Sequence, residues 1–379
     1  MKVDYPIISA DSHITEAPNT YLDYIDPKYH DTAPRIVETE NKGDIYVIDG
    51  MRATIPMGLV AAAGQEWNEL NSKAKYSEIH RSGWDSNYRL ADQKRDGISA
   101  EVIYPSVGMV LCNHPDFDYK KAAMDAYNRW ISEYCSVDPN RLIGLGQTAM
   151  RSPEEGIEDL HKMKAAGMKG VMMPGNPQVE DYDSPIYGEF WDACTDLGLV
   201  PSFHILTNSS DNMSKRRGPK MNSFLAIIRG VQDVMGMFVL GGVFERHPKL
   251  KVVCVEADAG WVPHYMYRMD HAYNRHRAWL TAGINRLPSE YFKEHIYLTF
   301  QDDFVAFQNA EQMNWRRLCW ANDFPHSDST WPWSQDMLTE QTAHLTPEMT
   351  RAILCDNTAE LYGIDLATLP VGGDVLAAA

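Results

Sequence analysis

Short apolar runs alternate with longer amphipathic stretches along most of the chain. The apolar runs have the length and composition of buried strands, and the stretches between them have the spacing of helices. This alternation is typical of repeated βα units. Eight runs are expected to form strands: Ile7–Ala10, Ala100–Tyr104, Leu142–Gln147, Gly170–Met173, Val200–Ile205, Lys251–Glu256, Ile296–Gln301 and Leu318–Ala321.

The ends of two intervening helices are marked by their residues. Ser152-Pro153-Glu154-Glu155 has the serine, proline and acids of a helix N-terminus, and Ala165-Ala166-Gly167 closes that helix. Ser184-Pro185 begins another helix, which ends at Leu197-Gly198. Because eight strands alternate with helices, we predict an α/β fold, a distorted (β/α)8 TIM barrel. Its active site would lie at the carboxyl ends of the strands.

Length and composition fit one domain with an insertion and a tail. The 379 residues are 44% hydrophobic and 23% charged, as in ordinary globular proteins, and residues 1–366 are expected to form a single barrel domain. Residues 38–88 do not fit the repeat, and we interpret them as a lid inserted after the first strand. A purely structural flap fits the same residues equally well. Residues 367–379 are expected to form a flexible tail.

The net charge of −17 speaks against nucleic acids and anionic membranes as partners. There is no apolar run of about 18 residues, and the first residues do not resemble a secretory leader, so we expect a cytoplasmic protein. The six cysteines lack CxxC spacing and are expected to be reduced core thiols. The expected partners are a small-molecule substrate and further copies of the chain, in a homodimer or higher homo-oligomer.

Acidic residues and histidines stand at the carboxyl ends of several predicted strands. Asp11 and His13 alternate after the first strand, His204 ends the fifth, and Asp323 follows the eighth. Carboxylates and imidazoles are ligands of zinc, manganese and iron, and a mixed set with room for water is typical of catalytic sites. We therefore predict that these four residues bind one divalent metal. Asp323 could also take a proton from a metal-bound water.

Other residues near the predicted barrel mouth are candidates for substrate binding. Arg217 belongs to the one dense basic cluster, which could bind a substrate carboxylate or phosphate or could simply be solvated. Trp261 and Trp331 favour a bulky, partly apolar substrate, such as an aromatic ring, a ring-cleavage product or a long acyl group. Asp302, with its neighbour Asp303, could orient substrate or cap the next helix.

Four stretches of the chain carry a family pattern: Asp11-Ser-His-Ile-Thr-Glu, Ser202-Phe-His, Gly242-Val-Phe-Glu-Arg-His-Pro-Lys-Leu-Lys-Val and Asn322-Asp-Phe-Pro-His-Ser-Asp. They resemble the amidohydrolase superfamily, and more narrowly its amidohydrolase-2 branch, that of aminocarboxymuconate-semialdehyde decarboxylase. The resemblance implies a distorted TIM barrel and a divalent metal, with Asp11, His13, His204 and Asp323 at the family's ligand positions. The family's first motif usually reads His-x-His or Glu-x-His. The aspartate of this chain therefore admits manganese or iron beside zinc.

The chain departs from the family at the end of the sixth strand. In the family's decarboxylases a histidine acts there beside the metal, and Glu256 stands at the matching position. Hydrolysis needs a base that deprotonates water, whereas decarboxylation needs an acid that donates a proton to carbon, and an ionised carboxylate is a poor acid. We therefore favour a metal-dependent hydrolase of an amide, ester, thioester or vinylogous C–C bond. The alternatives are a non-oxidative decarboxylase of a hydroxyaryl or unsaturated carboxylic acid, and a metal-binding barrel without activity.

His264 and His326 are the nearest other imidazoles and join Glu256 and Asp323 as candidate catalytic residues. Together with Glu256 the two histidines could hold a second metal, or His264 could simply face the pocket from a helix. Glu256 could also form a salt bridge with a barrel arginine.

Overall fold

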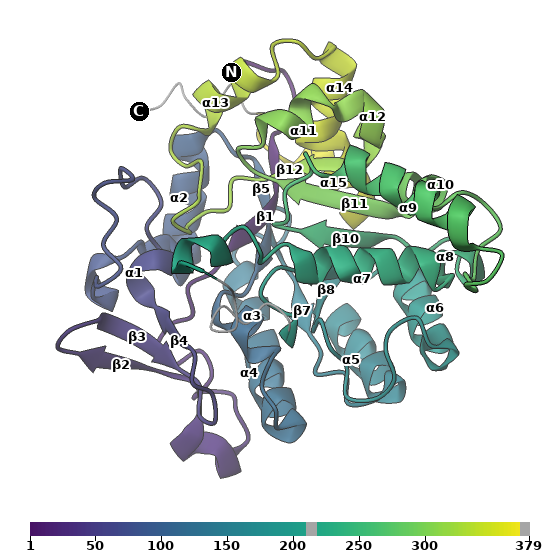
Figure 1. Cartoon of the computed structure of the whole chain (residues 1–379). Coiled ribbons are helices and arrows are strands. Elements are labelled where there is room, and N and C mark those ends of the chain that lie inside the picture. The colour runs from purple at the N-terminus through teal and green to yellow at the C-terminus, as the bar shows by residue number, and fades with distance from the viewer. Residues whose placement is uncertain (210–217, 372–379) are drawn as a thin grey trace.

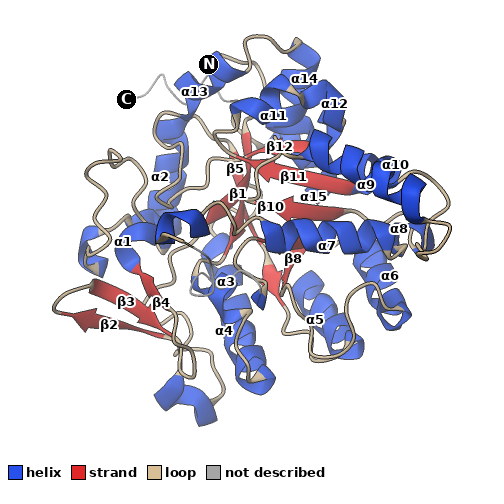
Figure 2. Ribbon diagram, in the orientation of Figure 1, coloured by secondary structure: helices blue, strands red, loops and turns tan. Residues whose placement is uncertain are grey.

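The computed structural model describes residues 1–209 and 218–371. Parallel strands form its centre and follow one another in chain order (Figure 1), and Figure 2 shows helices around them. The first sheet contains β1 (Ile8–His13), β5 (Ala100–Tyr104) and β6 (Leu142–Gly144). The second runs through β7 (Gly146–Gln147), β8 (Gly170–Met173), β9 (Val200–His204), β10 (Val252–Val255), β11 (Ile296–Phe300) and β12 (Leu318–Trp320).

Backbone hydrogen bonds join the two sheets into a distorted barrel. Between β6 and β7, Leu145 N–H donates to Ile103 O of β5 at 3.0 Å. At the other seam, bonds of 3.1 and 2.7 Å tie residues 11–13 of β1 to residues 323–324, which follow β12. All eight predicted strands are present, the third of them divided into β6 and β7.

The capping residues mark the start of the first predicted helix and the ends of both, whereas Ser184 caps a 3-10 helix, Pro185–Tyr187, and the second α-helix begins only at Gly188. The Ser152 side chain accepts a hydrogen bond from Glu155 N–H at the start of α5 (Pro153–Ala165), and left-handed Gly198 ends α6 (Gly188–Leu197). The other helices are α1 (Met57–Val60), α2 (Ser86–Asp96), α3 (Val107–Leu111), α4 (Phe117–Cys135), α7 (Arg229–Leu240), α8 (Val243–Arg246), α9 (Val262–His276), α10 (Pro288–His295), α11 (Phe304–Gln308), α12 (Ala310–Met313), α13 (Ser334–Gln341), α14 (Pro347–Arg351) and α15 (Asn357–Tyr362).

The segment between β1 and β5 contains a small antiparallel sheet of its own. Its strands are β2 (Arg35–Thr39), β3 (Gly43–Val47) and β4 (Thr54–Pro56), and they lie to one side of the barrel (Figure 1). After α1, Ala63 N–H donates to Pro325 O and Ser327 N–H donates to Leu59 O, both at 3.0 Å. Residues 57–63 therefore contact the loop that carries Asp323. That the insertion acts as a lid stays a prediction.

The C-terminal segment stays packed on the domain beyond residue 367, where the sequence predicts a flexible tail. Leu366–Thr368 form a short 3-10 helix and Leu369 is buried, so residue 367 does not begin a free tail. Residues 372–379 lie outside the described part of the chain.

All six cysteines are buried and unpaired, as predicted. Among the helices that the structure describes, none has the length and apolar character needed to cross a membrane.

Gly64 lies where the insertion meets the loop after β12. It has φ +79, and a Cβ atom built on it would lie 2.7 Å from Trp331 Cζ3. We expect Gly64→Ala to lower the free energy of unfolding by about 2–4 kcal/mol, because left-handed backbone strain adds to a steric clash. Urea unfolding measures this loss.

Gly167→Ala is the matched control for this substitution. Gly167 has φ +80 with no heavy atom within 4 Å of a built Cβ, so backbone strain alone should cost about 1–2 kcal/mol. Equal losses in the two variants would show that the insertion does not press on Trp331.

Candidate metal centre

A bulge in β1 turns Asp11 and His13 toward the barrel interior. The register of β1 on β5 shifts between Ser9 and Ser12, whose hydroxyl oxygens lie 2.9 Å apart. Ser12 Oγ also donates to Glu101 Oε1 at 3.1 Å, away from the interior. The shift leaves the Asp11 and His13 side chains together on the inner side.

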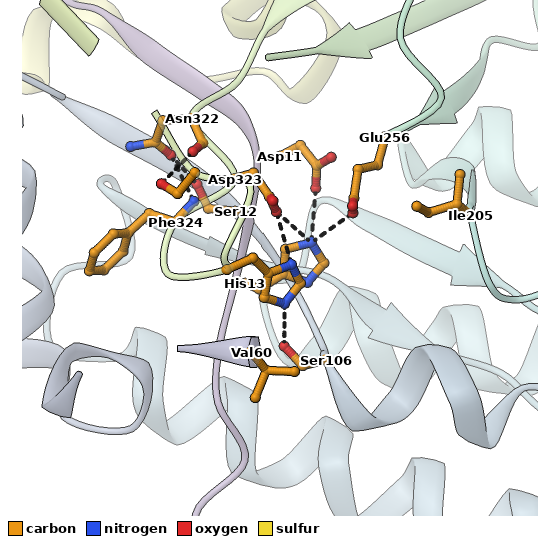
Figure 3. A network of polar contacts seen from close by, with 12 residues as sticks. Asp11, Ser12, His13, Val60, Ser106, Ile205, Glu256, Asn322, Asp323 and Phe324 are labelled. Carbon is orange, nitrogen blue, oxygen red and sulfur yellow. Dashed lines mark hydrogen bonds and ion pairs between the residues drawn. The ribbon is translucent and has the colours of Figure 1, made fainter. Parts of the chain in front are cut away.

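Three more side chains reach the same point from other strand ends. His204 is the last residue of β9, beside Val255 in the register of β9 and β10. Glu256 and Asp323 follow β10 and β12 with left-handed backbones, φ 56 and φ 51. Simple alternation from Val255 would point Glu256 outward. The left-handed turn instead directs its carboxylate toward His13, as Figure 3 shows.

Possible metal-ligand atoms of five residues surround one point. His13 Nε2 lies 3.5 Å from Asp11 Oδ1, 3.4 Å from Glu256 Oε2 and 3.4 Å from Asp323 Oδ1. His204 Nε2 lies 3.3 Å from His13 Nε2, 3.6 Å from Asp11 Oδ1 and 3.0 Å from Glu256 Oε2. Ligand atoms about 2.1 Å from one ion stand about 3.0–3.5 Å apart at octahedral or tetrahedral angles. These separations therefore fit a single divalent metal.

Four carboxylate oxygens of this cluster lack hydrogen-bond partners. Asp11 Oδ1, Glu256 Oε2 and both carboxylate oxygens of Asp323 are buried and make no hydrogen bond. Buried carboxylates without a compensating cation or donor cost several kcal/mol. A divalent cation would satisfy all of them at once, so the residues present fit a metal.

The charges of the cluster set its protonation in the metal-free protein. Burial lowers the pKa of His204, but the carboxylates of Glu256 and Asp11 outweigh this effect and raise the pKa to about 10. The pKa of His13 is also raised, because Asp11 and Glu256 outweigh burial. Burial opposes ionisation of Glu256, but the charges of His204 and His13 lower its pKa. In the metal-free protein a protonated His204 therefore faces ionised carboxylates, and the raised pKa of His13 favours the same charge on its ring.

His326 lies directly beside the cluster and is held on both sides. Its ring stacks on His13 with centroids 3.8 Å apart, and its Nδ1 lies 3.0 Å from Asp323 Oδ1. Its Nε2 lies 2.8 Å from Ser106 Oγ, and that hydroxyl donates to Ile14 O at 2.7 Å. Since a hydroxyl has one proton to donate, His326 Nε2 carries the proton of its bond to Ser106. Nδ1 of a neutral His326 is then an acceptor facing Asp323.

Burial determines which of Asp323 and His326 holds a proton. Burial raises the pKa of Asp323, and the charges of Glu256 and Asp11 raise this pKa further. Burial lowers the pKa of His326, and the charge of His13 lowers that pKa further. In the metal-free protein the pair therefore holds its proton on Asp323.

The structure brings together six of the predicted site residues: Asp11, His13, His204, Glu256, Asp323 and His326. Potential ligand atoms of Asp11, His13, His204 and Glu256 lie within 4.8 Å of one another, as do those of His13, Glu256, Asp323 and His326. His264 belongs to neither group and is exposed on α9. The structure therefore does not assemble a second metal site from Glu256, His264 and His326.

The structure describes three of the four predicted substrate-binding residues, and two of them, Trp261 and Trp331, contact residues next to Glu256 and Asp323. Trp261 Nε1 donates to Ala257 O at 2.8 Å. Trp331 is buried and packs on Phe324 with centroids 5.2 Å apart. Arg217 lies outside the described residues.

Asp302 and Asp303 have different positions. Asp302 is exposed and accepts a hydrogen bond from Gln341. Asp303 caps α11 by accepting from Ala306 N–H, and it also accepts from Gly260 N–H at 2.7 Å. The capping alternative therefore holds for Asp303.

We expect His204→Ala to reduce bound metal after dialysis to about a tenth of an equivalent per chain, because it removes one of two imidazole ligands. His264→Ala should keep the wild-type content, since His264 is exposed outside the cluster. Elemental analysis of both variants, with melting temperatures as a check on folding, measures the difference. Equal metal content in the two variants would contradict the assignment of His204.

Metal binding should release protons at neutral pH. The pKa of His204, raised to about 10, means that its ring is protonated at neutral pH without metal, and a ligand imidazole must be deprotonated. We expect release of at least one proton per metal at pH 7, and a smaller release as the pH rises past 10. Calorimetric titration with manganese in buffers of different ionisation enthalpy measures the number. A heat independent of the buffer would refute this protonation state.

Comparison with known proteins gives the family. A family model described as Amidohydrolase matches residues 77–364. The chain is 27% identical over 226 residues to 2-amino-3-carboxymuconate-6-semialdehyde decarboxylase of Dictyostelium discoideum, a stretch that covers 57% of this chain and 59% of that protein. The match thus spans less than two thirds of this relative.

Solved structures share the fold over nearly the whole chain. An amidohydrolase from Mycobacterium avium subsp. paratuberculosis K-10 matches with a TM-score of 0.77 at 19% identity, covering 97% of this chain and 100% of that one. The 5-carboxyvanillate decarboxylase of Novosphingobium aromaticivorans DSM 12444, complexed with manganese and 4-hydroxy-3-methoxy-5-nitrobenzoic acid, matches with a TM-score of 0.67 at 16% identity. The match covers 95% of this chain and 96% of that one. From its family match over most of its length, the chain belongs to the amidohydrolase family.

Proposed function

We propose that this protein is a metal-dependent non-oxidative decarboxylase of a hydroxyaryl or unsaturated carboxylic acid. Two of the relatives it matches are named as decarboxylases, and one of these was crystallised with manganese and a substituted hydroxybenzoic acid. The observation that carries the proposal is the contact of 3.0 Å between Asp323 and His326 beside the donor cluster. This pair can supply the acid that decarboxylation needs; the sequence named both residues as candidates but not their contact.

Decarboxylation breaks the bond between the carboxyl carbon and the adjacent ring or vinyl carbon. The electron pair of that bond stays on the ring or vinyl carbon, carbon dioxide leaves, and the carbon takes up a proton. A bound divalent metal would supply positive charge to hold the substrate carboxylate and a neighbouring oxygen. The protein must add a proton donor close to that charge.

Asp323 and His326 are suited to donate the proton. In the metal-free protein the raised pKa of Asp323 favours its protonated form, and the Nδ1 of His326 is within reach to take this proton when Asp323 binds the metal as a carboxylate. Ser106 holds the other side of the ring, so the Nδ1 keeps its direction. A proton can thus be held at His326 Nδ1, beside the Asp323 carboxylate, and passed to carbon.

Glu256 takes a different role in this proposal from the histidine of the family's decarboxylases. Its pKa is lowered by His204 and His13, so it stays ionised and is a poor acid. Its Oε2 lies 3.0 Å from His204 Nε2 and has no hydrogen-bond partner, which suits a metal ligand. The glutamate at position 256, where the family's decarboxylases have histidine, therefore adds a negative charge to the cluster. The role of the acid is left to Asp323 and His326.

Hydrolysis is the second candidate, and the same carboxylate favours it. An ionised, buried Glu256 beside a metal could accept a proton from water. The two reactions differ in their products, because hydrolysis incorporates water oxygen and releases no carbon dioxide.

With manganese and a panel of hydroxybenzoates and unsaturated diacids in D2O, we expect carbon dioxide release and one deuterium on the carbon that lost the carboxyl group. Proton NMR and a coupled carbon dioxide assay measure both products. Incorporation of 18O from labelled water without carbon dioxide would instead establish hydrolysis.

On the substrate so found, His326→Gln should lower kcat by roughly 10²–10⁴ with manganese content unchanged, the usual contribution of an acid. His264→Gln is the matched control on the exposed face of α9 and should keep wild-type kcat. A fully active His326→Gln variant would remove His326 from the proposed mechanism.

A further inference from the structure

A buried arginine outside the donor cluster contacts both segments that carry its ligands. Arg89 of α2 is 0% exposed. Its Nη1 donates to His13 O at 2.6 Å, and its Nη2 donates to Phe324 O at 3.1 Å. His13 is itself in the cluster, and Phe324 is the residue directly after Asp323. One rigid guanidinium therefore bridges the end of β1 and the loop after β12.

Glu101 of β5 fixes the direction of this guanidinium. Arg89 Nε donates to Glu101 Oε2 at 2.6 Å, and Nη2 donates to Oε1 at 3.1 Å. Such two-point pairing holds the guanidinium plane and leaves its outer N–H groups aimed at the two carbonyl oxygens. The Phe324 ring lies against the guanidinium, 4.7 Å from its carbon.

The bridge lies at the seam where the barrel closes. Phe324 O accepts from His13 N–H at 2.7 Å as well as from Arg89. The distance of 3.4 Å between His13 Nε2 and Asp323 Oδ1 depends on how these two segments are held. A lysine at position 89 would keep the positive charge but could not serve both carbonyls and both carboxylate oxygens in one plane.

We propose that Arg89 is a positioning residue of the metal centre, which sets the separation of the His13 and Asp323 ligands through their backbones. The inference rests on the metal-dependent function proposed above, but not on the reaction that the metal serves. Outer residues that orient metal ligands typically change metal affinity 10- to 100-fold when they are replaced.

The test is manganese affinity of metal-free protein, measured from the electron paramagnetic resonance signal of free Mn²⁺ during titration. We expect Arg89→Lys to raise the dissociation constant by roughly 10- to 100-fold. Glu101→Gln keeps Arg89 but removes the charge that orients it, and should give a smaller loss. It also tests the inference if Arg89→Lys does not fold.

Gln93→Leu is the matched control, because Gln93 is buried on the same helix and also donates to Glu101, at 2.7 Å. None of its hydrogen bonds reaches residue 13 or 324. We expect a lower melting temperature but manganese affinity within about threefold of wild type, since Arg89 keeps its bonds to Glu101, His13 O and Phe324 O.

The outcomes separate this inference from the proposed reaction. The positioning role of Arg89 would be overturned if folded Arg89→Lys or Glu101→Gln protein bound manganese as tightly as the wild type. It would also be overturned if the wild-type protein bound no manganese. Weakened affinity in Arg89→Lys but not in Gln93→Leu supports it. That support stands even if no carboxylic acid releases carbon dioxide, a result that would defeat only the decarboxylase proposal.

Discussion

The seam between β1 and the segment after β12 is the constraint on which the rest of the site depends. Backbone hydrogen bonds join residues 11–13 to residues 323–324, and the same residues present carboxylates and an imidazole to the interior. The hydrogen bonds that close the barrel therefore also bring these possible metal ligands together. In water these carboxylates would repel one another or be solvated. The fold holds them together because the strand ends that carry them converge inside the barrel.

Packing three carboxylates and three imidazoles into two overlapping groups has electrostatic consequences. Each ionised carboxylate raises the pKa of the histidines it faces, and the crowding of carboxylates raises the pKa of Asp323. The site is therefore asymmetric: one side favours binding a cation, and the other holds a proton against His326. Pairs of groups whose environments separate their pKa values commonly divide binding and acid roles in enzymes.

Backbone conformation matters as much as side-chain identity in this site. Glu256 and Asp323 both have positive φ, an unfavourable state for residues with a Cβ atom. Thr299 Oγ1 accepts from Glu256 N–H at 2.9 Å and donates to Asp11 Oδ2 at 3.3 Å, which links the turn after β10 to β1. Local strain of this kind persists where surrounding contacts hold it, and it places carboxylates that a regular strand would turn away.

The sequence by itself determined the repeat of strands and helices, because apolar runs and capping residues act locally. It also marked Asp11, His13, His204 and Asp323, since strand ends of a barrel converge whatever the details of packing. It named Glu256 and His326 as catalytic candidates, but it could not show how they lie in the site, because the left-handed turn, the stacked ring and the Ser106 hydroxyl that hold them belong to distant parts of the chain. The sequence also could not tell which of Asp302 and Asp303 caps the helix, or which of His264 and His326 lies in the site. The members of each pair differ in burial, which the sequence does not show. Those choices were made by tertiary structure, which alone decides which polar groups leave water and which partners they then find.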